Sequence, residues 1–219
     1  MIFPLPFDTS LFNYPVGKIT IEDDWNEQEF LKSAKDFQLV YLFTEEPLGF
    51  SSPSIKLVDT KITFQKNLSP LDQIEDIRKF NKPALNDELI ELAYLSGIYS
   101  RFKTDPRLQN QEFEKLYKLW INKAFENQEI LIAPEQAGMV TYSVDKDMGA
   151  IGLIAVSENH QGKGWGRKLV QAAENKALHA GAKKMQIPTQ ETNIPACKLY
   201  QSLGYTPAEI AYVYHWWKG

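Results

Sequence analysis

The segment Gln161–Leu169 places three glycines and three cations where a strand pattern passes into a helix pattern. The glycines, which leave no Cβ beside the backbone, are Gly162, Gly164 and Gly166. Consecutive backbone N–H groups can therefore approach an anion closely, and the start of the helix adds a partial positive charge. The cations are Lys163, Arg167 and Lys168. This combination predicts a phosphate site, whereas the alternative is a helix-start turn without a ligand.

The glycine spacing excludes two common phosphate motifs. Read from Gly162, the dinucleotide fingerprint G-x-G-x-x-G would require glycine at Arg167, and the chain has no GxxxxGK[ST] loop. The strand before the loop also follows a predicted meander, not the strand–helix–strand order of those folds.

A second pattern with chemical potential is TNIPACKLYQSLGY, Thr192–Tyr205. Asn193 is a good N-cap, and Tyr200 is seven residues later, which places the two on one face of a helix. Taken alone, the pair is a cap and a half-buried tyrosine. Cys197 shares this face, but no histidine is near it in sequence to activate a thiol, so we interpret it as a packing residue.

Together, Gln161-x-x-Gly164-x-Gly166 and the later Asn193-x6-Tyr200 resemble the GNAT superfamily of N-acetyltransferases. The resemblance implies an α+β fold with a central mixed, mostly antiparallel sheet flanked by helices. It implies acetyl-CoA as co-substrate, no metal, and Tyr200 as general acid on the departing thiolate. The residues that it assigns to the coenzyme are Ile154, Ala155, Val156, Gln161, Gly162, Lys163, Gly164, Trp165, Gly166, Arg167 and Asn193. The general base stays open, with Asp59 and Glu158 as candidates.

The elements that must position these residues follow from hydrophobic periodicity. Strands are predicted at Val16–Ile21, Phe37–Phe43, Lys56–Lys66 and Glu209–Trp217, with short strand-like runs from Gln128 to Ser157 that form a meander and another at Lys184–Pro188. Helices are predicted at Asn26–Phe37, from Asn86, at Gln111–Phe125 with Trp120 on the buried side, at Gly164–Ala180 and at Asn193–Leu203. A polar connector, Asn67–Lys82, predicts a division into a smaller α/β subdomain, 1–80, that shapes the acceptor pocket, and a catalytic domain, 81–219.

The first half resembles bacterial acetyltransferases that act on TDP-4-amino-4,6-dideoxy sugars. The similar segments are FDTSLFNYPVGKI, KLVDTKITFQK and GIYSRFKTDPRL. In the last of these, Arg101 and Lys103 are candidates to bind a nucleotide diphosphate, Arg101 through a bidentate contact. The alternative for both is a solvated charge at a helix end.

Composition narrows the class of protein. The 219 residues carry a net charge of −4, spread without long single-sign runs, which argues against nucleic acid as a partner. The N-terminus is broken by prolines and no apolar run reaches ~20 residues, so we expect neither a signal peptide nor a membrane span. One cysteine fits a reducing compartment, and we expect a cytoplasmic protein. His160, His179 and His215 are scattered and form no metal or triad motif.

The preferred hypothesis is acetyl transfer to the amine of a nucleotide-linked amino sugar. A protein N-terminus, a polyamine or another small amine is the alternative acceptor. A non-catalytic CoA-binding sensor is a third hypothesis, against which the Asn193/Tyr200 pair argues, because a sensor needs no acid. A homodimer stays open.

Overall fold

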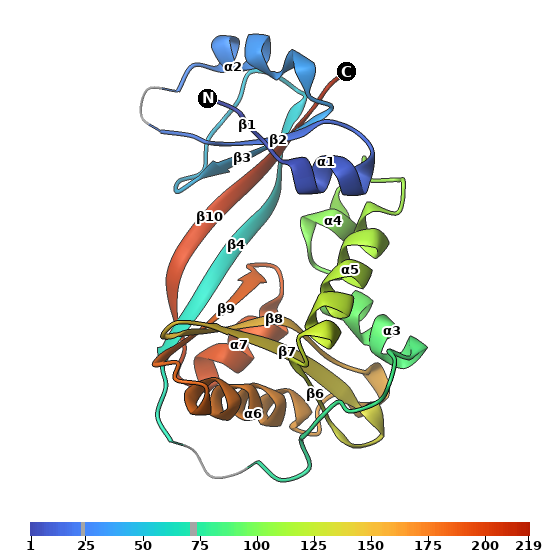
Figure 1. Ribbon diagram of the computed structural model, residues 1–219. Coiled ribbons are helices and arrows are strands. Elements are labelled where there is room, and N and C mark those ends of the chain that lie inside the picture. The colour runs from blue at the N-terminus through green and yellow to red at the C-terminus, as the bar shows by residue number, and fades with distance from the viewer. Residues whose placement is uncertain (23–24, 71–73) are drawn as a thin grey trace.

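The computed structural model describes residues 1–22, 25–70 and 74–219, and within them ten strands form one sheet (Figure 1). The strand order is β1-β2-β3-β10-β4-β9-β8-β7-β6-β5. The strands are β1 (Phe3–Pro4), β2 (Val16–Thr20), β3 (Leu39–Thr44), β4 (Ile55–Asn67), β5 (Arg78–Lys79), β6 (Ile130–Ile132), β7 (Gly138–Asp145), β8 (Met148–Val156), β9 (Lys184–Gln190) and β10 (Thr206–Trp217). The α-helices are α1 (Pro6–Phe12), α2 (Glu27–Ser33), α3 (Asp87–Ser96), α4 (Arg101–Thr104), α5 (Glu112–Glu126), α6 (Trp165–His179) and α7 (Ile194–Ser202).

The sheet is mixed and mostly antiparallel, as expected. Only the β2–β3 and β8–β9 pairs are parallel among the described strands. The predicted meander is confirmed, because β6, β7 and β8 pair in sequence and antiparallel.

The two longest strands join the N-terminal part of the chain to the C-terminal part. β4 pairs with β10 from Ile55 to Gln65 and with β9 from Lys61 to Asn67. In Figure 1, β4 and β10 run side by side between the layer of β1–β3 and the layer of β6–β9. Strands from both sides of the boundary expected at residue 80 therefore belong to the same sheet. The division into two folding units stays a prediction, and residues 71–73 of the polar connector lie outside the described residues.

Helices cover both faces of the sheet around β7 and β8. α3 and α5 pack on one face, and their core includes Leu92, Leu116 and Met139. α6 packs on the other face in a core that also holds Phe64 and Tyr200. No described helix is long and apolar enough to span a membrane.

Two short helices were absent from the sequence prediction. The prolines near the N-terminus indicated irregular structure, but α1 begins at Pro6. The fixed φ of proline suits the first turn of a helix. α4 follows the end of α3 at Gly97, where an added Cβ would lie 2.2 Å from the ring of Tyr117. Glycine is required at this position by the close approach of α5.

Candidate functional site

The parallel strands β8 and β9 separate after three residue pairs, and a cavity opens between them. Their pairing runs from Met148 opposite Lys184 to Ala150 opposite Gln186 and stops there. Beyond that point β9 stays paired with β4, and β8 stays paired with β7. The cavity has a volume of about 970 Å³. It is lined by residues of β8, of the loop Gln161–Gly166, which we call the glycine loop, of α7, β9 and β4, and of the α3–α4 segment.

The open edge of β8 presents backbone N–H groups to this cavity. Ser157 N–H donates to Ala137 O on the β7 side. Because N–H directions alternate along a strand, the N–H groups of Val156 and Ile154 point away from β7, toward the cavity. Before this stretch the β7–β8 register shifts between Val140 and Tyr142, and there the Leu153 N–H donates to Thr141 Oγ1 at 2.8 Å. The open edge can therefore pair with an extended ligand as a further strand would.

The glycine loop closes one end of the cavity. Gly162 and Gly164 have φ of +73° and +84°, and a Cβ at either would meet nothing within 4 Å. Backbone conformation, not space, therefore requires glycine here. Gln161 Nε2 donates to Val156 O at 3.1 Å and fastens the loop to the end of β8. The α6 N-terminus follows directly, so the residues present fit an anionic group such as a pyrophosphate.

The cations of the loop lie in different places. Arg167 lines the cavity and donates to Ser202 Oγ at 2.8 Å. Lys163 does not line it, since its Nζ donates to Asn159 O at 3.0 Å. Lys168 binds Asp76 at 2.8 Å on the exposed surface. Of the expected coenzyme residues, all except Lys163 line the cavity.

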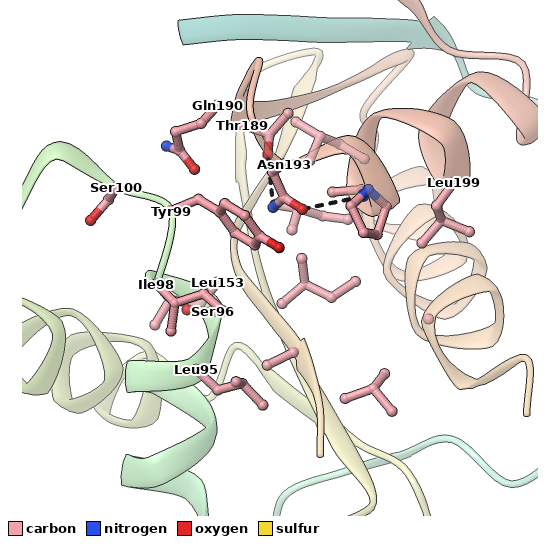
Figure 2. A pocket seen from close by; sticks show the side chains of 18 of the residues that line it. Leu95, Ser96, Ile98, Tyr99, Ser100, Leu153, Thr189, Gln190, Asn193 and Leu199 are labelled. Atoms are coloured by element: carbon pink, nitrogen blue, oxygen red, sulfur yellow. Dashed lines mark hydrogen bonds between the residues drawn. The ribbon is translucent and has the colours of Figure 1, made fainter. Parts of the chain in front are cut away.

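α7 contributes the expected Asn193 and Tyr200 to the same cavity. Asn193 Oδ1 accepts the Ala196 N–H at 3.3 Å, and its Nδ2 donates to Thr189 Oγ1 at 3.3 Å (Figure 2). Asn193 is thus the N-cap that the sequence predicted. The ring of Tyr200 is buried against Phe64, and burial raises the pKa of its hydroxyl above the usual value. The hydroxyl therefore stays protonated and is suited to donate a hydrogen bond.

The opposite end of the cavity, which we call the Asp59 half, contains a buried carboxylate. Asp59 on β4 is 8% exposed, and burial raises the pKa of its carboxyl to about 6, an effect that the positive charge of Arg101 opposes. Gln190, at the end of β9, lines the same half. A carboxyl with this pKa can exchange a proton near neutral pH.

Arg101 lies in the Asp59 half among aromatic rings. Its guanidinium carbon is 4.3 Å from the ring centroid of Phe102 and 4.9 Å from that of Tyr41. Its Nε is buried and has no hydrogen-bond partner within the described part of the chain. Lys103 is outside the cavity because α4 turns it to the other side, where it pairs with Glu114 at 3.4 Å.

Other residues of the Asp59 half were not expected from sequence. The α3–α4 segment, from Leu95 to Phe102, forms one wall opposite Thr189 and Asn193 (Figure 2). Trp120 was expected in the core, but it is 36% exposed and lines the cavity with Tyr117. The spacing of Trp120 in α5 fits a buried face, so periodicity gave no signal for its exposure.

The remaining candidates take lesser positions. Glu158 lines the cavity beside the glycine loop. Cys197 is not in the lining, its Sγ lies 3.7 Å from Gln190 O, and burial raises the pKa of its thiol. No group of three or more metal-ligating side chains occurs among the residues that the structure describes.

Known proteins share parts of this arrangement. Streptothricin acetyltransferase of Escherichia coli is 38% identical over 60 residues, which are 27% of this chain and 34% of that protein. The spore coat polysaccharide biosynthesis protein SpsD of Bacillus subtilis is 21% identical over 191 residues, or 85% of this chain and 65% of SpsD. The chain thus spans about a third of the first relative and just under two thirds of the second.

Solved structures share the fold at low identity. A GCN5-related N-acetyltransferase from Sphaerobacter thermophilus superposes with a TM-score of 0.59 at 14% identity, covering 91% of this chain and 72% of that one. A glucosamine N-acetyltransferase region of a fungal multi-domain GH3 β-N-acetylglucosaminidase gives 0.58 at 11% identity, covering 98% and 30%. The model of the acetyltransferase (GNAT) family matches residues 87–205, which is more than half of the chain. With the open β8 edge, the glycine loop and the α7 pair inside the matched region, this chain belongs to the GNAT family of acetyltransferases.

Proposed function

We propose that this protein transfers the acetyl group of acetyl-CoA to the amine of a nucleotide-linked amino sugar. The observation that carries the transfer reaction is the single cavity that joins the glycine loop, Tyr200 and the buried carboxylate of Asp59. Acetyl-CoA supplies an acetyl thioester. Its pyrophosphate would bind at Gly162–Gly166 and its pantetheine arm along Ile154–Val156, with Asn193 beside it.

The chain's own residues divide the proton transfers between the two ends of the cavity. The acceptor amine must lose a proton before or as its nitrogen bonds to the acetyl carbon, and Asp59 is the carboxylate placed to take it. As the carbon–sulfur bond breaks, the Tyr200 hydroxyl supplies a proton to the thiolate sulfur. A cavity-facing N–H of β8, from Ile154 or Val156, would stabilise the negative charge on the acetyl oxygen.

The raised pKa of Asp59 makes its carboxylate a stronger base, and the gain in proton affinity follows from the size of the shift. A carboxyl with a pKa of about 6 in place of 3.8 is a stronger base by roughly 3 kcal/mol of proton affinity. Tyr200 faces the opposite requirement. An ordinary phenol of pKa ~10 donates to a thiolate of pKa ~8.5 at a cost of about 2 kcal/mol, and the cost for Tyr200 is larger because burial raises its pKa. Tyr200 therefore acts best as a hydrogen-bond donor to developing charge.

Two observations support a nucleotide sugar as the acceptor. The similarity to SpsD, whose name places it in spore coat polysaccharide biosynthesis, extends over 85% of this chain and includes the β4 strand that carries Asp59. The Asp59 half also combines a cation, Arg101, with exposed aromatic surface at Trp120, which suits a diphosphate next to a sugar or base.

Thiol release from acetyl-CoA by the purified chain tests the proposal. A TDP-4-amino-4,6-dideoxyhexose, a peptide amine and spermidine are compared side by side, with a reaction that lacks any acceptor amine as the control for hydrolysis. Turnover confined to the nucleotide sugar supports both parts of the proposal. Turnover of the peptide or spermidine alone retains acetyl transfer and refutes the sugar acceptor. Tight acetyl-CoA binding without turnover of any amine refutes the enzyme and favours the sensor hypothesis.

A further inference from the structure

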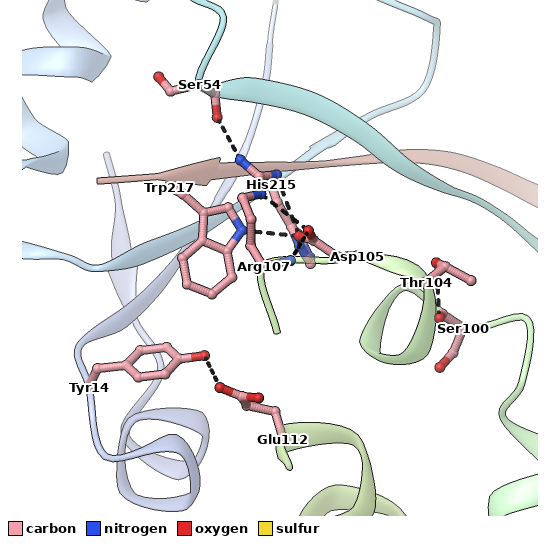
Figure 3. A network of polar contacts seen from close by, with 9 residues as sticks. All are labelled: Tyr14, Ser54, Ser100, Thr104, Asp105, Arg107, Glu112, His215 and Trp217. Carbon is pink, nitrogen blue, oxygen red and sulfur yellow. Dashed lines mark hydrogen bonds and ion pairs between the residues drawn. The ribbon is translucent and has the colours of Figure 1, made fainter. Parts of the chain in front are cut away.

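Asp105, directly after α4, is the centre of a buried polar cluster that no step of the proposed reaction uses (Figure 3). The Asp105 cluster consists of Asp105, Arg107, His215 and Trp217. Asp105 Oδ2 accepts from His215 Nδ1 at 2.6 Å and from Trp217 Nε1 at 3.0 Å. Asp105 Oδ1 accepts from the Arg107 backbone N–H at 3.0 Å and from its Nε at 3.2 Å.

Within the cluster His215 is neutral and Asp105 is ionised, which defines the tautomer of the imidazole. Burial lowers the pKa of His215 to about 4, so its ring is uncharged at neutral pH and Nδ1–H donates to the carboxylate. The donors around Asp105 keep the pKa of its carboxyl below the usual range, although burial alone would raise it. A buried polar cluster of this kind contributes less to stability than apolar packing of the same volume.

The cluster lies between the end of α4 and the end of β10. The Asp105 N–H donates to Arg101 O at 3.0 Å and closes the single turn of α4. α4 has only four residues, too few to be stable without tertiary contacts. The Arg101 Nε has no hydrogen-bond partner in the described residues, so the location of this guanidinium depends on the backbone of α4, on the rings around it and on the charges of Asp8 and Asp59.

The strand at the other end of the cluster also places Asp59. His215 and Trp217 lie at the end of β10, and Val213 of the same strand pairs with Asp59 of β4. Asp105 therefore connects the segment that carries Arg101 to the strand pair that carries Asp59. Arg107 contributes less, because its side chain is 29% exposed and its ion pair is screened by solvent.

We propose that Asp105 is a positioning residue, which holds Arg101 beside Asp59 in the cavity through its hydrogen bonds to His215 and Trp217. The inference rests on the proposed function, since it assigns Arg101 and Asp59 to binding and deprotonation of the acceptor. It differs from a general stabilising role because its effect must pass through Arg101.

A double-mutant cycle separates the two roles. Asp105→Asn places an N–H₂ group toward the His215 and Trp217 donors, and Arg101→Met removes the charge while keeping a side chain against the rings. We expect Asp105→Asn to raise the acceptor KM roughly ten- to hundred-fold and to leave the acetyl-CoA KM within about two-fold. In the Arg101→Met background, Asp105→Asn should change the acceptor KM by less than about two-fold.

Two further variants make the result decisive. Trp217→Phe removes one donor, leaves no unpaired buried group and should produce a milder increase of the same kind. Tyr14→Phe is the matched control, because it removes a hydrogen bond of 3.1 Å to buried Glu112 in the same region without touching α4. Equal increases in Tyr14→Phe, or additive effects of Asp105→Asn and Arg101→Met, would overturn the positioning role.

Hydrogen–deuterium exchange gives a readout that needs no acceptor. In Asp105→Asn, peptides covering residues 98–105 should exchange at least about ten-fold faster, while peptides covering residues 161–170 keep the wild-type rate. Unchanged exchange at 98–105 overturns the positioning role even if the protein acetylates no amine. If the wild type shows no turnover but residues 98–105 exchange faster in Asp105→Asn, the proposed function is refuted. The positioning of α4 by Asp105 is then still supported.

Discussion

The pH dependence of turnover is the most direct test of Asp59. With a pKa of about 6, the carboxylate fraction of Asp59 is about 0.9 at pH 7 and about 0.1 at pH 5. If only the carboxylate accepts the proton, kcat/KM for the acceptor falls about ten-fold between these pH values. An aspartate at its usual pKa of 3.8 would keep about 0.9 of its carboxylate at pH 5, so the two cases are well separated.

Two substitutions link this acidic limb to Asp59. Asp59→Asn should lower kcat by roughly 10² to 10⁴ and abolish the limb near pH 6. Arg101→Met should move the limb to higher pH, because the positive charge of Arg101 opposes the effect of burial on the pKa of Asp59. Initial rates of thiol release, measured from pH 5 to pH 8 at subsaturating acceptor, give kcat/KM directly.

The controls exclude other origins of the limb. Acetyl-CoA affinity, measured at each pH, shows whether the coenzyme site titrates in the same range. A Glu158→Gln variant examines the other candidate carboxylate, which lies beside the glycine loop and should leave the limb in place. A limb near pH 6 that survives in Asp59→Asn would refute Asp59 as the proton acceptor.

Three further results are expected. Tyr200→Phe should lower kcat by roughly 10²-fold without changing acetyl-CoA affinity or thermal stability, because the buried ring is retained; an unchanged kcat would refute its role as acid. Gly164→Ala should weaken acetyl-CoA binding at least about five-fold, as measured by calorimetry, since alanine is strained by roughly 1 kcal/mol or more at φ +84°. Gly49→Ala is the control and should have no effect, because Gly49 has open space around it and no positive φ. In the Asp59→Asn background, which removes one opposing proton uptake by the folded state, urea denaturation should show up to about 2 kcal/mol lower stability at pH 5 than at pH 7, an effect that the raised pKa of Asp8 opposes in part. The cause is His215, whose pKa is about 4 when folded and 6.5 when unfolded, so the unfolded chain gains a proton that the native protein excludes; equal stability at both pH values would contradict a neutral, buried His215.

Local patterns in the sequence were sufficient to predict the end of the cavity formed by the glycine loop and Asn193. Gly162, Gly164 and Asn193 act through the backbone within a few residues of themselves, by positive φ or by capping a helix. Such effects depend on neighbours along the chain, so spacing alone reveals them. The same holds for the long amphipathic helices and for the β6–β8 meander, whose short connections leave little choice of pairing.

The Asp59 half required the tertiary structure. Asp59, Arg101 and Gln190 come from segments far apart in the chain, and no local rule states that β4 pairs with both β9 and β10. Burial, which raises the pKa of Asp59, exists only after α4 has packed against that strand. The exposure of Trp120 and the separate placement of Arg101 and Lys103 likewise follow from how a few helical turns meet the sheet. The sequence by itself determined the glycine loop and the Asn193 cap of α7, because those features are local. Only the folded chain decided which charges face them across the cavity, because that depends on contacts between residues distant in sequence.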